Sequence, residues 1–203
     1  MKRAAFVLFL LSVSPRAQAQ VVVTMTPEMI ASAIASGANA KKDIGLYPLQ
    51  ERSGFGNGPL VGFFTTPFSR VARASYDAKR TYKPFTQADV TAEMVAPELH
   101  IYGTSTVSDG TIVNVEAIVV MPRKSKDPSN AIQPSKSDLI ADEYKNRMGW
   151  TGKGRSMMAV FPLTVLSEDN EAHVVFDGRL PGTSMVKGLC SDCAVPFKLK
   201  DVR

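Results

Sequence analysis

The sequence predicts a mainly β protein: an antiparallel β-sandwich with an N-terminal helix and one helical insertion. Residues 112–122 form the longest β-prone apolar run after the N-terminus, with Val113, Val115 and Val119 in alternation. From about Met94 onward, short β-prone runs are separated by turn signals. These runs do not alternate regularly with helices, which argues against a doubly wound parallel sheet. An immunoglobulin-like strand arrangement is one form of such a sandwich.

The chain has 203 residues, of which 44% are apolar and 21% charged. These values are typical of globular proteins and argue against a disordered chain. We predict three parts: a signal peptide over residues 1–19, a helix-containing segment over 20–93 that packs on the sandwich, and the sandwich itself over 94–203.

The first nineteen residues have the order of a secretory leader. Lys2 and Arg3 precede an apolar run at 4–13, and the small residues of 17–19 resemble a cleavage site. No later run reaches the roughly 18 apolar residues that a membrane-spanning helix needs. We therefore predict an exported protein, periplasmic or extracellular, whose mature chain begins near Gln20 and has no transmembrane segment.

Charge disfavours a nucleic-acid partner. The full chain has 24 Lys and Arg against 19 Asp and Glu, a net charge of +5. The predicted leader contains Lys2, Arg3 and Arg16 but no acid, so the mature chain keeps 21 basic residues and a net charge of +2. Nucleic-acid binding requires a basic stripe with interleaved aromatic residues, whereas the basic residues here are scattered.

The N-terminal segment begins with a helix. Thr26 suits the N-cap, Pro27 the first helical position and Gly37 the end, which predicts a helix over residues 27–36. The glycine-rich stretch 53–62 lacks the Lys-Ser/Thr ending of a phosphate-binding loop and is interpreted as a loop or tight turn. Residues 60–64 favour a short strand, and 71–82 fit either a strand or a helix.

The central run at 112–122 is expected to pair with residues 157–166, a second long apolar run. Alternation predicts that Val115, Val119, Val160 and Val174 are buried in a common core. Further strands are predicted at 99–107, 172–176 and 194–199.

A long polar stretch, residues 123–155, separates these two runs. Within it, Ser137 as N-cap and Gly149 as terminator predict a helix over 137–148. Stretches of this length often have a function. Its candidate ligand-binding residues are Trp150, as a core anchor or a stacking platform, and Arg123 with Lys124, as a solvated loop or an anion site.

Two cysteines, Cys190 and Cys193, stand three positions apart. Zinc would need two more ligands, and the strand-like residues after Cys193 disfavour a redox site at a helix N-terminus. Because an exported protein meets an oxidising compartment, we predict a Cys190–Cys193 disulfide. No metal or other cofactor is predicted.

Motifs for catalysis are missing. The sequence contains neither Gly-x-Ser-x-Gly nor His-Glu-x-x-His. We therefore predict a non-enzymatic secreted or periplasmic β-sandwich that binds a ligand or an unknown envelope component. The alternative is a small secreted hydrolase that uses His100 or His173, the two histidines of the chain. Geometry discriminates the two, because a catalytic imidazole must lie in a cleft near a carboxylate, hydroxyl or thiol.

Overall fold

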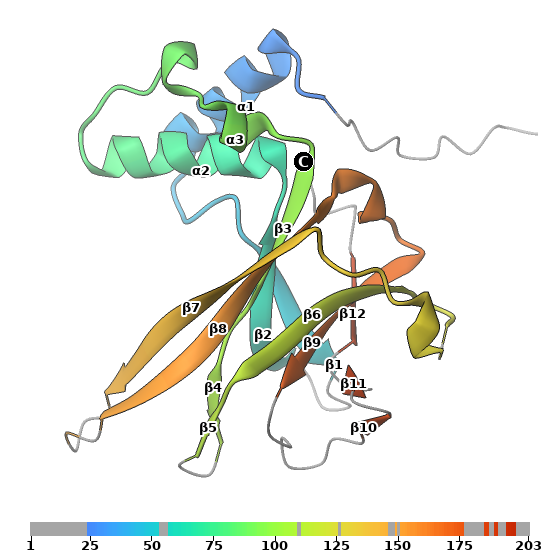
Figure 1. Ribbon diagram of the computed structural model, residues 1–203. Helices are drawn as coiled ribbons and strands as arrows, with labels where there is room; N and C mark the ends of the chain where they lie inside the picture. The colour runs from blue at the N-terminus through green and yellow to red at the C-terminus, as the bar shows by residue number, and fades with distance from the viewer. Residues whose placement is uncertain are drawn as a thin grey trace, which may run out of the picture.

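The structure is a computed structural model that describes residues 24–52, 57–108, 111–125, 127–145, 149, 151–176, 185–186, 189–190 and 194–197. The predicted signal peptide lies outside the described residues. Three α-helices form a layer at one end of a β-structure (Figure 1). The helices are α1 (Pro27–Asn39), α2 (Pro67–Arg80) and α3 (Ala92–Val95), with 3-10 turns η1 (Gln87–Asp89), η2 (Pro128–Asn130) and η3 (Leu163–Val165).

The strands form two main antiparallel sheets, which confirms the predicted mainly β fold. An immunoglobulin-like arrangement is not confirmed. The five-stranded sheet has the order β1 (Tyr47–Arg52), β2 (Asn57–Thr65), β3 (Glu98–Gly103), β8 (Thr151–Pro162), β7 (Lys136–Lys145). The three-stranded sheet has the order β12 (Ala194–Pro196), β9 (Asn170–Phe176), β6 (Val115–Pro122). Two short hairpins are β4 (Thr106–Ser108) with β5 (Thr111–Val113), and β10 (Met185–Val186) with β11 (Leu189–Cys190).

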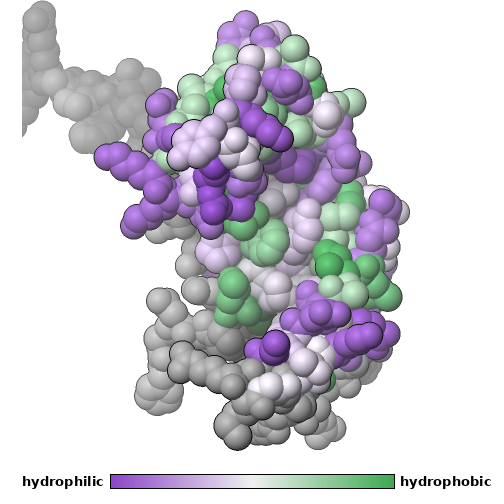
Figure 2. All heavy atoms as spheres, turned by 90° about the vertical axis from the view of Figure 1, so that its left-hand side faces the viewer, coloured by the Kyte–Doolittle hydropathy of each residue, from purple (hydrophilic) through white to green (hydrophobic). Residues whose placement is uncertain are grey.

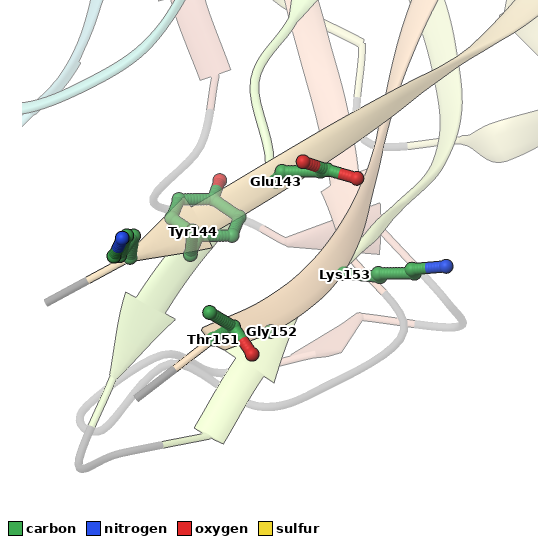
Figure 3. A pocket seen from close by; sticks show the side chains of 6 residues that line it. Glu143, Tyr144, Thr151, Gly152 and Lys153 are labelled. Atoms are coloured by element: carbon green, nitrogen blue, oxygen red, sulfur yellow. The ribbon is translucent and has the colours of Figure 1, made fainter. Parts of the chain in front are cut away.

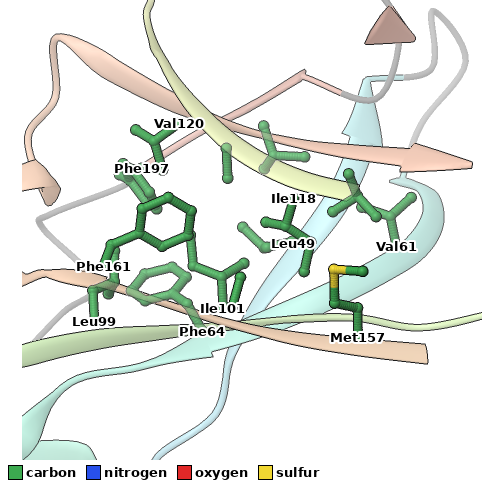
Figure 4. Packing of buried hydrophobic residues seen from close by; sticks show 14 of the residues in the cluster. Leu49, Val61, Phe64, Leu99, Ile101, Ile118, Val120, Met157, Phe161 and Phe197 are labelled. Carbon is green, nitrogen blue, oxygen red and sulfur yellow. The ribbon is translucent and has the colours of Figure 1, made fainter. Parts of the chain in front are cut away.

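One hydrophobic core lies between the two main sheets (Figure 4). Leu99, Ile101 and Phe161 come from the five-stranded sheet, and Ile118 and Val174 come from the three-stranded one. Burial of a leucine- or phenylalanine-sized side chain contributes about 1.5–3 kcal/mol. This shared core is what joins the two sheets.

A β-bulge in β6 changes which side chains face that core. Val115 lies opposite Phe176, but Ala117 lies opposite Val175, so Glu116 is the extra residue. After the bulge the core-facing positions move from odd to even numbers, because one additional residue inverts the alternation. The four valines predicted to be buried are all buried, yet only Val115 and Val174 belong to the shared core. The prediction that Val119 and Val160 share it was wrong.

The predicted pairing of the two long apolar runs was also wrong. Residues 112–122 divide into β5 and β6, which lie in different sheets, and β6 pairs with β9. β8 instead pairs with β3 on one side and β7 on the other. Apolar alternation identifies buried strands, but it does not specify their partners.

The predicted helical insertion at 137–148 is a strand. β7 pairs with β8 over ten residues, from Lys136 opposite Val160 to Lys145 opposite Thr151. Asp142 and Tyr144, which share one face of β7, both bond to Ser105. A spacing of two residues delivers both side chains to one partner, and this tertiary constraint overrides the helix-like start at Ser137.

The helical layer begins as predicted. Thr26 caps α1 by accepting a hydrogen bond from the amide of Met29, but the helix continues past Gly37 to Asn39. A Cβ at Gly37 would lie 2.1 Å from the carbonyl oxygen of Ala72 in α2. Gly37 therefore permits close contact between the two helices, rather than ending α1.

The ambiguous residues 71–82 lie mostly in α2. Thr66 and Ser69 form a capping box, with each side chain bonded to the other residue's amide, and Pro67 takes the first helical turn. The pair Thr66-Pro67 repeats the Thr26-Pro27 signal of α1 and could have identified this helix. No helix among the described residues is long and apolar enough to cross a membrane.

Leu99 and Leu139 offer a matched test of the fold. Leu99 is 0% exposed in the shared core, whereas Leu139 on the edge strand β7 is 60% exposed. We expect Leu99→Ala to lower the free energy of unfolding by about 2–5 kcal/mol and Leu139→Ala by less than about 0.5 kcal/mol. Chemical denaturation measures both, and equal losses would contradict the exposed position of β7.

Candidate functional site

The main candidate site is a groove between α2 and the outer face of the five-stranded sheet, the face turned away from the shared core. We call it the α2–sheet groove; its volume is about 470 Å³. Figure 2 shows one side of the molecule, with hydrophilic and hydrophobic residues mixed over the helical layer and further hydrophobic residues below it. The groove is lined by Leu46, Phe63, Thr65, Arg70, Arg73, Ala74, Asp77 and Tyr102.

Two stacked aromatic rings form its floor. Phe63 on β2 lies opposite Tyr102 on β3, and their ring centroids are 4.6 Å apart at an interplanar angle of 20°. Both residues are half-buried, so each presents part of its ring to the groove. An aromatic surface of this kind favours flat or apolar groups, and the phenolic hydroxyl adds a hydrogen-bonding tip.

Burial raises the pKa of Tyr102 above the value of an exposed tyrosine. The hydroxyl is therefore protonated at neutral pH and can both donate and accept hydrogen bonds. Beside it on the groove wall, the Oγ1 of Thr65 is buried and forms no hydrogen bond within the described part of the chain. A buried hydroxyl without a partner is unfavourable by about 1–3 kcal/mol, which a ligand can relieve.

The opposite wall is charged. Nε of Arg73 lies 2.8 Å from Oδ2 of Asp77, one helical turn away, and its Nη1 lies 3.5 Å from Oδ1 of Asp43. The guanidinium also lies 5.8 Å from the centre of the Tyr76 ring. These contacts hold a half-buried cation and a carboxylate beside the aromatic floor, so a ligand with polar groups finds both signs of charge.

Arg70 fixes the helical wall to the sheet. Its three nitrogens donate to the carbonyl oxygens of Met94, Ala96 and Glu98 at 3.2, 2.7 and 2.9 Å, where the chain enters β3. Burial lowers the pKa of Arg70, although an arginine starts so high that the guanidinium stays charged. Its planar fork matches three carbonyls at once, which a lysine cannot do.

The two histidines lie in strands. Nε2 of His100 on β3 lies 3.1 Å from Oε2 of Glu98, and Nε2 of His173 on β9 lies 3.3 Å from Oε1 of Glu171. Both imidazoles have a nearby carboxylate, as a catalytic group would. Neither, however, lines the α2–sheet groove or the two other recesses described here. The hydrolase alternative stays a prediction.

A polar cluster joins Ser105, which precedes β4, to the β7–β8 hairpin. Asp142 accepts hydrogen bonds from the hydroxyls of Ser105 and Ser156, and the hydroxyl of Tyr144 donates to the carbonyl of Ser105 at 2.6 Å. A Cβ at Gly154 would lie 2.7 Å from Oγ of Ser105, so a larger residue there would displace the cluster. Its serines and carboxylate bond to one another, which fits a structural role in holding the hairpin.

Two smaller recesses accompany the groove. One, of about 430 Å³, lies near the tip of the β7–β8 hairpin and is drawn in Figure 3. It is lined by Glu143, Tyr144, Lys145, Thr151, Gly152 and Lys153. The other, of about 370 Å³, lies between the helices around Ile44 and Phe68. Neither has the stacked aromatic pair of the main groove.

The structure does not bring the sequence-predicted site residues together. Arg123 and Lys124 are exposed in the turn after β6 and line none of the three recesses. Trp150 and Cys193 lie outside the described residues, so the stacking platform and the Cys190–Cys193 disulfide stay predictions. Sequence reasoning missed Phe63 and Tyr102, which are far apart in the chain and become neighbours only through strand pairing.

Comparison of the chain with protein-family models, with curated proteins and with solved structures finds no match. A functional interpretation therefore depends on the geometry of the chain itself.

Arg70 and Arg80 are compared to test the hydrogen bonds that join α2 to the start of β3. Arg70→Lys keeps the charge but cannot bond to three carbonyls, and hydrogen bonds to charged groups contribute about 1.5–3 kcal/mol. We expect Arg70→Lys to lower the free energy of unfolding by at least about 1.5 kcal/mol. Arg80→Lys, at a side chain that is 61% exposed, should change it by less than about 0.5 kcal/mol. Urea denaturation measures the loss in both variants, and small, equal losses would contradict the role of Arg70.

Burial of His100 makes the free energy of unfolding depend on pH. Burial lowers its pKa below the ordinary value of 6.5, so the unfolded chain takes up a proton first as the pH falls. The stabilisation from the neutral imidazole is thus complete above pH 6.5 and is lost as the pH falls from there toward the folded-state pKa. We expect His100→Gln to weaken the fall in Tm over this window, measured by calorimetry. Parallel curves for the two proteins would contradict the assignment.

Proposed function

We propose that this protein is an exported, non-enzymatic β-sandwich that binds a small ligand or envelope component in the α2–sheet groove. The single observation that carries the proposal is the stacked Phe63–Tyr102 pair, half-buried at the bottom of a groove with charged walls. The leader-like pattern of residues 1–19 supports export.

The groove suggests the chemistry of the ligand. Phe63 and Tyr102 favour a flat or apolar ring, whereas Arg73 and the hydroxyl of Tyr102 favour a polar or anionic substituent beside it. A pocket that combines apolar lining with a few converging polar groups is typical of small-molecule sites. The proposed ligand is therefore amphiphilic, with a ring-shaped apolar part and a polar end.

A fluorescent probe with this chemistry tests the groove. Anilinonaphthalene sulfonate joins aromatic rings to an anionic sulfonate, and its fluorescence rises when it leaves water. We expect Phe63→Ala to weaken its binding by about two- to thirteenfold, since aromatic contacts contribute about 0.5–1.5 kcal/mol. Fluorescence titration of the native chain measures this.

Leu139→Ala is the matched control, because it removes an exposed apolar side chain from β7, outside the groove. Probe binding should be unchanged in that variant. If Leu139→Ala weakens binding and Phe63→Ala does not, the probe occupies the sheet edge and the proposed groove is wrong. If Phe63→Ala weakens probe binding as expected, mass spectrometry of small molecules that co-purify with the wild type but not with Phe63→Ala would identify the natural ligand.

A further inference from the structure

The end of α2 places a tyrosine in an unusual backbone conformation. The amide of Lys83 donates to the carbonyl of Ala78 at 2.9 Å, and the amide of Tyr82 donates to that of Lys79 at 3.0 Å. These two bonds define a Schellman motif, in which the residue after the C-cap adopts the left-handed conformation. Tyr82 occupies that position with φ = 56°.

Two features of Tyr82 are unfavourable for the isolated fold. Glycine is the usual residue here, because a side chain in the left-handed conformation is strained. Tyr82 is also 98% exposed, the largest exposure among the large hydrophobic residues described. Backbone strain at a functional surface is common when the surrounding structure holds it in place. The exposure and conformation of Tyr82 therefore suggest a role outside the fold.

Basic residues lie on both sides of this tyrosine in the chain and in the loop after α1. The Nζ of Lys79 lies 3.4 Å from the carbonyl of Ala40, and Nη1 of Arg80 lies 3.9 Å from Oδ1 of Asp43. These contacts bring the loop after α1 beside the last turn of α2. We call the exposed residues at this place the α2-end surface: Lys41, Lys42, Lys79, Arg80, Tyr82 and Lys83.

The α2-end surface thus combines five cations with one projecting aromatic ring. Asp43 and Asp77 are the nearby carboxylates, and both are already in contact with arginines. Figure 1 shows the helical layer at the opposite end of the molecule from the tips of β7 and β8. Five exposed basic residues therefore gather on one surface of the helical layer, although the predicted mature chain has a net charge of only +2.

We propose that the α2-end surface binds the anionic phospholipid headgroups of a bilayer. Lysine and arginine are attracted to an anionic membrane surface, and a tyrosine ring is favoured at the headgroup level, where its apolar body and hydroxyl are both accommodated. Full exposure and a strained backbone at Tyr82 follow from this role, because the ring must project beyond the protein surface to enter the headgroup layer.

Nucleic acid is the other polyanion that a basic surface can bind. Single-stranded binding uses several aromatic platforms along a basic groove, whereas this surface presents one ring at its tip. The observations therefore favour a membrane surface, and single-stranded DNA serves as a competing probe in the test.

Vesicle flotation tests the proposal on the mature chain. The probes are phosphatidylcholine vesicles with and without phosphatidylglycerol. We expect binding only to the phosphatidylglycerol vesicles, and a loss of binding as sodium chloride screens the charges. A Lys79→Gln, Lys83→Gln variant should bind about fivefold more weakly for each lysine neutralised.

Lys145→Gln with Lys153→Gln is the matched control, because it removes the same charge from the β7–β8 hairpin, away from the helical layer. It should leave vesicle binding unchanged. Tyr82→Gly separates a membrane role from a structural one, since it relieves the strained position: Tm should stay equal or rise, while vesicle binding falls. Tyr82→Asn, which also tolerates the left-handed conformation, repeats this test.

Three outcomes would overturn the proposal: no binding to phosphatidylglycerol vesicles, equal losses in the two double-lysine variants, or binding to single-stranded DNA without binding to vesicles. The test does not depend on the α2–sheet groove, because Phe63→Ala leaves every residue of the α2-end surface in place. Failure of one proposal therefore leaves the other intact.

Discussion

The contact between Arg70 and the carbonyls of Met94, Ala96 and Glu98 is the interaction on which both proposed binding surfaces depend. It ties the first turns of α2 to the segment that leads into β3. Because the same segment continues to Tyr102, these hydrogen bonds set the distance between α2 and the stacked Phe63–Tyr102 pair. The guanidinium donates to all three carbonyls, and that of Ala96 also accepts from the amide of Glu98 at 2.7 Å.

One helix therefore serves two surfaces. The middle of α2, with Arg73 and Asp77, forms a wall of the α2–sheet groove, and its C-terminal end displays Tyr82 and the surrounding lysines. The buried stripe, which includes Val71 and Ala72, packs against α1. A helix that is fixed at its start and packed along one stripe can hold both remaining faces toward solvent without moving.

The β-structure contributes rigidity by a different means. β8 pairs with β3 and β7 on its two sides, and its inward side chains share the core with β6 and β9. The bulge at Glu116 lets both Val115 and Val120 face that core despite their odd and even positions. Beyond the core, the Ser105–Asp142 cluster fastens the long hairpin. The groove floor is thus supported by a sheet that is held from both sides.

The sequence by itself determined the local features whose physical cause is local. Thr26 and Pro27 start α1 because a hydroxyl cap and a fixed φ act on adjacent residues, and the β-prone runs at 112–122, 157–166 and 172–176 identify buried strands because their side chains are apolar. Only the tertiary structure decided strand partners, the bulge at Glu116 that moves core-facing positions from odd to even numbers, the strand conformation of β7, and the contact of Phe63 with Tyr102. These features depend on contacts between residues distant in sequence. The energy of such a contact depends on which surfaces meet in the folded chain, and no local sequence pattern specifies that.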